Sequence, residues 1–168
     1  MAFTVEDGTG VADANSYAAL DFANDYFTER AVAGWTGTVR AKQVALIRAT
    51  DYIEGRFGQR FIGDKVDAAQ SLSWPRTDAG DYGEDEVPLK LQRATCEYAL
   101  RALTAALAPD PLVDESGVTV VTVRKKLGPL EKQLQVVGSG YPQLIRAYPS
   151  ADMLLSGLVN PAAGRVYR

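Results

Sequence analysis

Few residues of this sequence are of the types that carry out catalysis. The chain has no histidine and one cysteine, Cys96, so it lacks the commonest general base and every Ser-His-Asp or Cys-His arrangement. Two carboxylate pairs, Asp51 with Glu54 and Asp114 with Glu115, have the residue types for acid and base catalysis. Because nothing in the sequence marks an enclosed cleft around either pair, we predict that the protein is not an enzyme and has no cofactor.

The segment 55–65 combines charges and aromatic rings that could bind a nucleic-acid strand. Its basic and aromatic residues alternate in the order Arg56, Phe57, Arg60, Phe61 and Lys65. Two further arginines, Arg40 and Arg48, precede the segment. Such a mixture can hold a strand by charge and base stacking. The alternative is a helix end with its rings in the core and its arginine stems along the surface. Strand binding requires an exposed Phe57 or Phe61 beside gathered cations, whereas the alternative requires buried rings.

The segment 77–86 is polar and rich in carboxylates, which are Asp78, Asp81, Glu84, Asp85 and Glu86. A calcium site of the EF-hand type needs a fixed glycine and a terminal glutamate, and this spacing is missing. We predict a solvated surface loop without a metal.

Composition and charge limit the class of protein. The 168 residues are 46% apolar and 23% charged, as expected for one soluble domain with a hydrophobic core. The net charge of −3 disfavours general affinity for nucleic acid, which comes mostly from phosphate neutralisation, and suits a conduit through which DNA passes. No signal-peptide pattern begins the chain, and no run has the roughly 18 apolar residues of a membrane span. We therefore expect a cytoplasmic protein without membrane contact.

Cap residues and apolar periodicity predict three helices in the first two thirds of the chain. They are expected from Ser16 to about Arg30, from Thr38 to about Phe57, and from Pro88 to about Leu107. The third should be the central helix, with Leu89 and Cys96 on its buried stripe. At such a position a cysteine is an inert apolar residue. Trp74, before Pro75, is expected to anchor the irregular segment that joins the second and third helices.

Two aromatic residues of the first helix lie outside its main apolar stripe. Phe22 and Tyr26 point to a second side of that helix. Either their own chain covers them, or they contact another subunit.

The chain changes character after Pro109 and Pro111. Residues 118–123 and 130–136 have strand-forming patterns on either side of Gly128-Pro129. A two-stranded hairpin is barely stable alone, so we expect it to lie on the helices or on another subunit. Ser150 is a candidate cap of a short last helix, which Asn160-Pro161 ends.

The predicted fold class is therefore mainly α, a small helical bundle with a β-hairpin or extended arm and a C-terminal tail. We expect one domain over 1–168, with a helical body at about 14–108, a hairpin arm at about 117–137, and a short helix and tail at about 150–168.

The order of several local patterns resembles the small head-tail connector (adaptor, or head-completion) proteins of tailed bacteriophages. These patterns are Ala14-Asn15-Ser16-Tyr17, the helical segment 45–53, Leu72-Ser73-Trp74-Pro75-Arg76, Val87-Pro88 and the segment 123–131. The resemblance implies a dodecameric ring under the portal, which extends the DNA channel and carries a stopper or tail protein. It places the protein in the virion neck, and in the host cytoplasm during assembly. DNA would pass through without sequence-specific binding.

The resemblance also suggests which residues make contacts. Candidates for contact with the portal or a neighbouring subunit are Val118, Val120, Val123, Leu130 and Leu134 of the hairpin, and Arg165, Val166, Tyr167 and Arg168 of the tail. Phe22 and Tyr26 are candidates for contact between subunits. The segment 77–86 and the tail after Leu158 match nothing that defines the family.

Related sequences are also labelled single-stranded-DNA-binding proteins that resemble the primosomal DnaT. This alternative function, in a replication or packaging complex, would place Arg56, Arg60 and Lys65 against nucleic acid.

Overall fold

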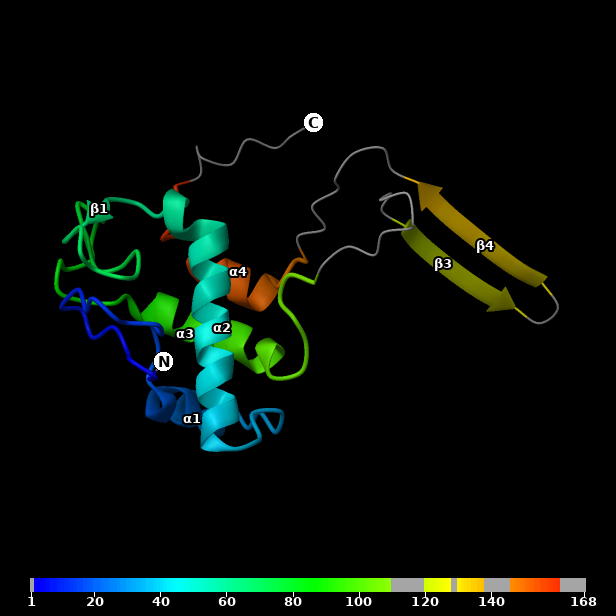
Figure 1. Ribbon diagram of the computed structural model, residues 1–168, viewed down its shortest axis with the longest axis horizontal. Coiled ribbons are helices and arrows are strands. Elements are labelled where there is room, and N and C mark those ends of the chain that lie inside the picture. Colours follow the sequence, from blue (N-terminus) through cyan, green and yellow to red (C-terminus); the bar gives the residue numbers. More distant parts are fainter. Residues whose placement is uncertain (1, 110–119, 128–129, 138–145, 161–168) are drawn as a thin grey trace. The chain divides into compact units, whose positions relative to one another are not determined.

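The computed structural model describes residues 2–109, 120–127, 130–137 and 146–160 (Figure 1). The chain forms two compact units. The first is a helical body that the chain leaves after Leu107 and re-enters at Ala147, and the second is the inserted segment 108–146. The fold is mainly helical with a β-hairpin, as the sequence predicts.

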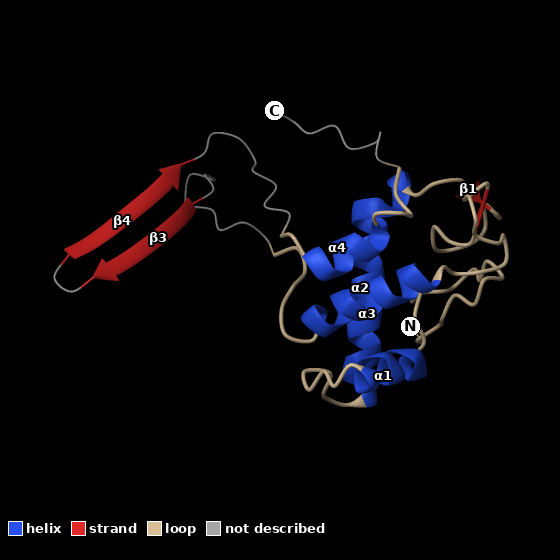
Figure 2. Cartoon of the chain, turned by 180° about the vertical axis from the view of Figure 1, so that it is seen from behind, coloured by secondary structure: helices blue, strands red, loops and turns tan. Residues whose placement is uncertain are grey.

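The described part of the body contains four α-helices: α1 (Leu20–Glu29), α2 (Val39–Phe57), α3 (Leu89–Ala102) and α4 (Pro149–Leu155). A single 3-10 turn, Gly58–Arg60, follows α2. Helix α3 packs against each of the other three, and Figure 2 shows α1, α3 and α4 lying across the long α2. The prediction that the third helix is central is confirmed.

The start of α1 differs from the prediction. Ser16 does not cap this helix, because its hydroxyl donates to the carbonyl of Ala18 and its backbone pairs with the chain's lead-in, through a bridge to Val5. The helix begins at Leu20 after Ala19. The pairing of residues 4–6 with residues 15–16 holds the backbone extended there and delays the helix.

The ends of two other helices also differ from the prediction. Helix α3 ends at Ala102, not Leu107, and the chain tightens there into a turn in which the amide and the hydroxyl of Thr104 both donate to the carbonyl of Arg101. Helix α4 begins at Pro149 after Tyr148, and Ser150 does not cap it. The Ser150 hydroxyl instead accepts a hydrogen bond from the Arg101 guanidinium at 2.6 Å. By contrast, α2 is as predicted, since the Thr38 hydroxyl accepts the Ala41 amide at 3.2 Å.

Trp74 anchors the irregular segment between α2 and α3, as predicted. Its side chain is fully buried and meets the Phe61 ring edge-on. The short strands β1 (Asp64–Lys65) and β2 (Arg76–Thr77) pair antiparallel in the same segment. The guanidinium of Arg76 donates to the carbonyls of Ile62, Gly63 and Ser73 and so ties the segment together.

The second unit contains the predicted hairpin. Strand β3 (Val120–Leu127) pairs antiparallel with β4 (Leu130–Val137) in a register that joins Val120 to Val137 and Leu127 to Leu130. Among the described residues this sheet has two strands. Each strand therefore has one edge without a described partner strand.

Candidate functional site

The aromatic residues of the segment 55–65 lie in the hydrophobic core. Phe57 is 7% exposed and Phe61 is 5% exposed. The guanidinium of Arg60 lies over the ring of Phe57 at 5.8 Å from its centroid. Neither ring offers a surface on which a base could stack. Of the two alternatives for this segment, the structure therefore has the helix end with its rings in the core.

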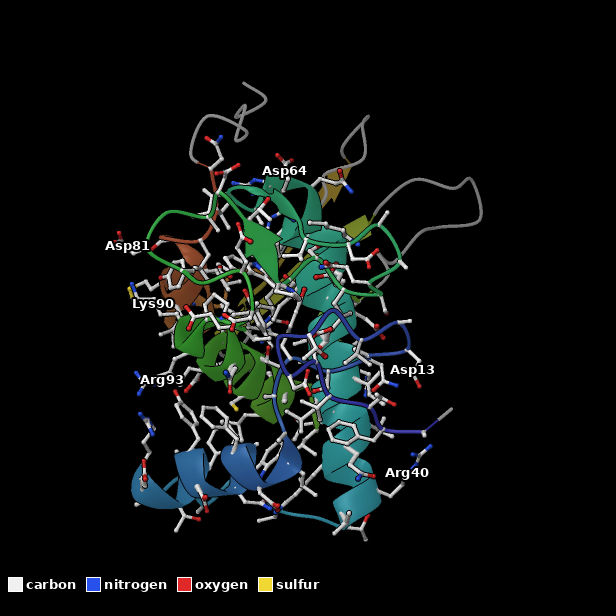
Figure 3. The ribbon with its side chains drawn as sticks, turned by 90° about the vertical axis from the view of Figure 1, so that its left-hand side faces the viewer. Asp13, Arg40, Asp64, Asp81, Lys90 and Arg93 are labelled. Atoms are coloured by element: carbon white, nitrogen blue, oxygen red, sulfur yellow. The ribbon has the colours of Figure 1, made fainter. Side chains whose placement is uncertain are left out.

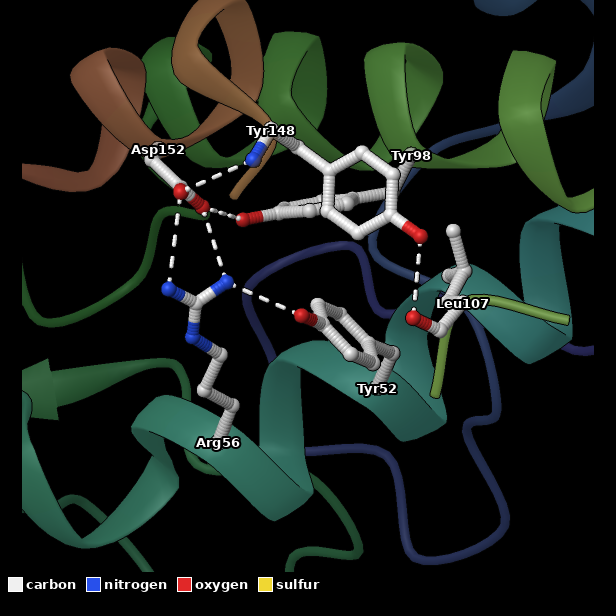
Figure 4. Close-up of polar contacts among 6 residues, drawn as sticks. All are labelled: Tyr52, Arg56, Tyr98, Leu107, Tyr148 and Asp152. Atoms are coloured by element: carbon white, nitrogen blue, oxygen red, sulfur yellow. Dashed lines mark hydrogen bonds and ion pairs between the residues drawn. The ribbon is translucent and has the colours of Figure 1, made fainter. Parts of the chain in front are cut away.

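Arg56 is held in a cluster that joins three helices (Figure 4). Its guanidinium forms an ion pair with Asp152 of α4 at 3.1 Å and donates to the hydroxyl of Tyr52 at 2.9 Å. The same carboxylate accepts the hydroxyl of Tyr98 from α3 and, at 3.1 Å, the backbone amide of Tyr148. Burial, with the hydrogen bond to Asp152, raises the pKa of Tyr98. Arg56 is therefore already paired.

The other predicted nucleic-acid contacts are not brought together. Lys65 is exposed on β1 and donates to the backbone carbonyl of Gln70 at 3.4 Å. Arg48 donates to the carbonyl of Ala102. Figure 3 shows Arg40 at the opposite end of the body from Asp64, the neighbour of Lys65. These cations are spread over the length of α2 and beyond it.

Tyr26 is covered by its own chain. It is 7% exposed, and its hydroxyl donates to the carboxylate of Glu97 at 3.0 Å. Burial, with this hydrogen bond, raises the pKa of Tyr26 to about 12. Phe22 is half-buried and stacks on Tyr26 with ring centroids 6.4 Å apart. Contact of Phe22 with a second subunit stays a prediction.

Two of the described side chains that could take part in catalysis, those of Cys96 and Glu54, are engaged in the packing and hydrogen bonding of the body. Cys96 is fully buried, and burial raises the pKa of its thiol to about 12. The carboxylate of Glu54 accepts the hydroxyls of Tyr17 and Ser73, which links α2 to two distant segments. Asp51 is exposed, and partial desolvation together with the charge of Glu54 raises the pKa of its carboxyl. Asp114 and Glu115 lie outside the described residues.

Among the described residues, no His, Cys, Asp and Glu side chains gather in a group of three or more that could hold a metal ion. No helix there has the length and apolar character to cross a membrane.

A groove of about 470 Å³ lies between the lead-in and the segment 77–89. The two backbones touch at Gly8, where an added Cβ would lie 2.1 Å from the carbonyl oxygen of Asp85. Its lining includes three exposed carboxylates, Asp7, Asp85 and Glu86, which we call its acidic rim, and the apolar side chains of Val5, Val87 and Leu89; a fourth carboxylate, Glu6, is buried. Leu89 is 48% exposed, so its predicted place on a buried stripe is wrong.

Sequence reasoning missed this groove. Its lining residues come from 5–7, 17–19 and 85–92, and the last of these ranges is distant in the sequence from the first two. The five carboxylates of 77–89, with no basic residue among them, were a visible signal of a charged surface, but only the fold brings Asp7 to them and leaves Leu89 exposed.

The register of the hairpin sorts its candidate contact residues by face. Alternate residues of a strand share a face, so Val123, Leu130 and Leu134 lie on one face and Val120 on the other. Val118 and the tail residues Arg165, Val166, Tyr167 and Arg168 lie outside the described residues.

A family model described as "Putative DnaT-like ssDNA binding protein" matches residues 1–168, the whole chain. The chain belongs to this DnaT-like family. Comparisons with curated proteins and with solved structures give no match. The DnaT-like label was the second of the two that the sequence suggested, and the connector role stays a prediction.

The three residues predicted to bind a DNA strand in this DnaT-like protein lie in three different surroundings. Arg56 is paired with Asp152, and Arg60 lies against Phe57. Lys65 is exposed. The basic residues of β3 and β4, which are Arg124, Lys125, Lys126 and Lys132, form a more compact group in the sequence.

Proposed function

We propose that this DnaT-like protein is a structural head-tail connector, which forms a ring between the portal and the tail or stopper of a tailed phage. One observation carries the proposal: a helical body with its own buried core contains an inserted hairpin, and each of its two strands has one edge without a partner among the described residues. Open edges are templates for pairing with another chain, and a two-stranded hairpin gains stability from such a partner. The proposal contains no catalytic step.

The body also supports this proposal over strand binding. Phe57 and Phe61 are buried, and Arg56 is engaged by Asp152. A ring protein has no need of stacking platforms, since DNA only passes through it. The net charge of −3 would limit the phosphate contacts that slow such a passage.

Co-expression with the portal protein of the same virus, followed by electron microscopy, tests the proposal. We expect portals with an added ring of density on the tail-facing side, and absence of the ring from portals expressed alone. Portals that never acquire a ring would contradict a connector role.

The family description favours a second function, the binding of single-stranded DNA. Its best described candidates are the cations of β3 and β4. Fluorescence anisotropy with a labelled oligothymidine, at several salt concentrations, measures it directly. Strand binding predicts an affinity that falls steeply with salt and falls again in the variant Lys125→Glu/Lys132→Glu. A connector predicts no binding at physiological salt.

A further inference from the structure

The two strands of the hairpin are basic, whereas the protein as a whole is acidic. Strands β3 and β4 contain four basic residues and one acidic residue, a formal charge of +3. Since the whole chain carries −3, the residues outside these strands carry −6 between them. This separation of charge within one chain makes two copies complementary to each other.

One face of the hairpin combines apolar residues with a pair of lysines. The register places six apolar residues on that face, namely Val121, Val123, Leu127, Leu130, Leu134 and Val136. Lys125 is directly opposite Lys132 among them. Like charges directly opposite each other destabilise a strand pair, so this face favours a partner that supplies carboxylates around an apolar centre.

The groove on the helical body has this composition. Leu89 lines it and is 48% exposed, and Asp7, Asp85 and Glu86 form its acidic rim. Within the described residues, the carboxylates of 78–86 take part in no ion pair, since the three ion pairs there involve Glu29, Glu97 and Asp152. Lys90 and Arg93 of α3 point outward from the body (Figure 3). The acidic rim therefore forms no ion pair with a described cation.

We propose that the hairpin of one copy docks on this groove of a second copy, with Lys125 and Lys132 against the acidic rim and the apolar residues over Leu89. The inference rests on the ring assembly proposed above and names the surfaces that build it. The donating and accepting surfaces differ, so the contact is head-to-tail and can close into a ring. Nucleic acid could neutralise the same lysines, but it would leave Leu89 exposed and would be repelled by the rim.

A charge exchange on the full-length protein tests this contact. One variant, Lys125→Glu/Lys132→Glu, reverses the charge of the two hairpin lysines. Another, Asp85→Lys/Glu86→Lys, reverses the charge of the groove's rim. A photo-crosslinker, p-benzoylphenylalanine in place of Leu130, reports where the hairpin lies. We expect crosslinks between copies to residues 85–92, reduced about tenfold in each reversed variant alone. Mixing the two variants should restore them. The control Arg40→Glu/Lys65→Glu changes two exposed cations of the body and should have little effect.

Crosslinks within one chain, crosslinks to other residues, absence of crosslinks between copies, or no rescue in the mixture would each overturn the inference. The same proteins are then added to portals. If portals acquire a ring while the crosslinks map elsewhere, the connector proposal stands and the groove contact fails. If the groove crosslinks form but portals acquire no ring, the contact stands and the connector proposal fails.

Discussion

The hydroxyl of Tyr148 donates a hydrogen bond of 2.9 Å to the backbone carbonyl of Leu107 (Figure 4). Leu107 is the last residue of the body before the inserted unit, and Tyr148 is the second residue after the chain returns. The bond therefore closes the base of the insertion from within the body. Tyr148 is 6% exposed and meets the rings of Tyr52 and Tyr98 edge-on, so the core itself positions this closure.

Tyr148→Phe should loosen the base of the insertion. The ring and its packing remain, but the buried carbonyl of Leu107 loses the hydroxyl, which costs about 1 to 3 kcal/mol of unfolding free energy. Urea denaturation measures this loss, and hydrogen exchange should speed up around Leu107. Tyr82→Phe is the matched control, because no hydrogen bond of the Tyr82 hydroxyl is found among the described residues. Equal stability of the two variants would contradict the closure.

The Asp152 carboxylate should be the most sensitive link between α4 and the rest of the body. Asp152→Asn keeps the shape but weakens the bonds to Arg56, Tyr98 and the Tyr148 amide. We expect a loss of about 2 kcal/mol in unfolding free energy, since partners of a partly buried charge are left unsatisfied. Chemical denaturation provides the measurement.

The control for Asp152→Asn is Glu29→Gln. Glu29 also pairs with an arginine, Arg30, but at 3.7 Å and with its side chain 75% exposed. Such surface pairs contribute about 0 to 1 kcal/mol. If both variants lose the same free energy of unfolding, the cluster at Asp152 contributes no more to stability than an exposed ion pair does.

Local signals explain which elements were predictable. The extent of α2 follows from the Thr38 cap and a continuous apolar stripe, and the hairpin follows from β-branched residues on either side of Gly128-Pro129. The error at Ser16 arose because pairing with the lead-in overrode a good capping residue. Tertiary contacts routinely override such weak local preferences.

The candidate sites were less predictable, since distant residues build them. Arg56 and Asp152 are 96 positions apart, and no local pattern marks them as partners. Leu89 has the spacing of a core residue, but it lies on the first turn of α3 at the edge of the core and faces the groove. Sequence periodicity gives the face of a helix and not how far the core extends along it.

Stability should fall at alkaline pH. Burial raises the pKa of the Cys96 thiol from 9.0 to about 12 and that of Tyr26 from 10.0 to about 12, and it also raises the pKa of Tyr98. Above pH 9 the unfolded chain therefore loses protons that the folded chain retains, and the free energy of unfolding decreases as pH rises through the folded pKa values. Below pH 9 this contribution is fully present.

The urea midpoint, measured between about pH 8 and pH 11, should show this decrease. Tyr98→Phe removes one of the responsible groups, so its midpoint should depend less on pH above pH 10, whatever its absolute stability. The Cys96 thiol should react with a thiol reagent only when urea unfolds the chain, because it is fully buried. A urea midpoint that stays constant up to pH 11 would refute the raised pKa values of Cys96, Tyr26 and Tyr98 in the folded chain.

The contact between the lead-in and the acidic segment should depend on Gly8. Its φ of +105° is unfavourable for any side chain, and an added Cβ would lie 2.1 Å from the Asp85 carbonyl oxygen. Gly8→Ala should therefore destabilise the protein by about 1 to 3 kcal/mol or more and separate the two walls of the groove. Gly55→Ala is the opposite case, because Gly55 lies within α2 and nothing is within 4 Å of its added Cβ. There the same substitution should stabilise the protein by about 1 kcal/mol. Calorimetry of the two variants compares them directly, and a Gly8→Ala protein as stable as Gly55→Ala would show that the two backbones are not held together.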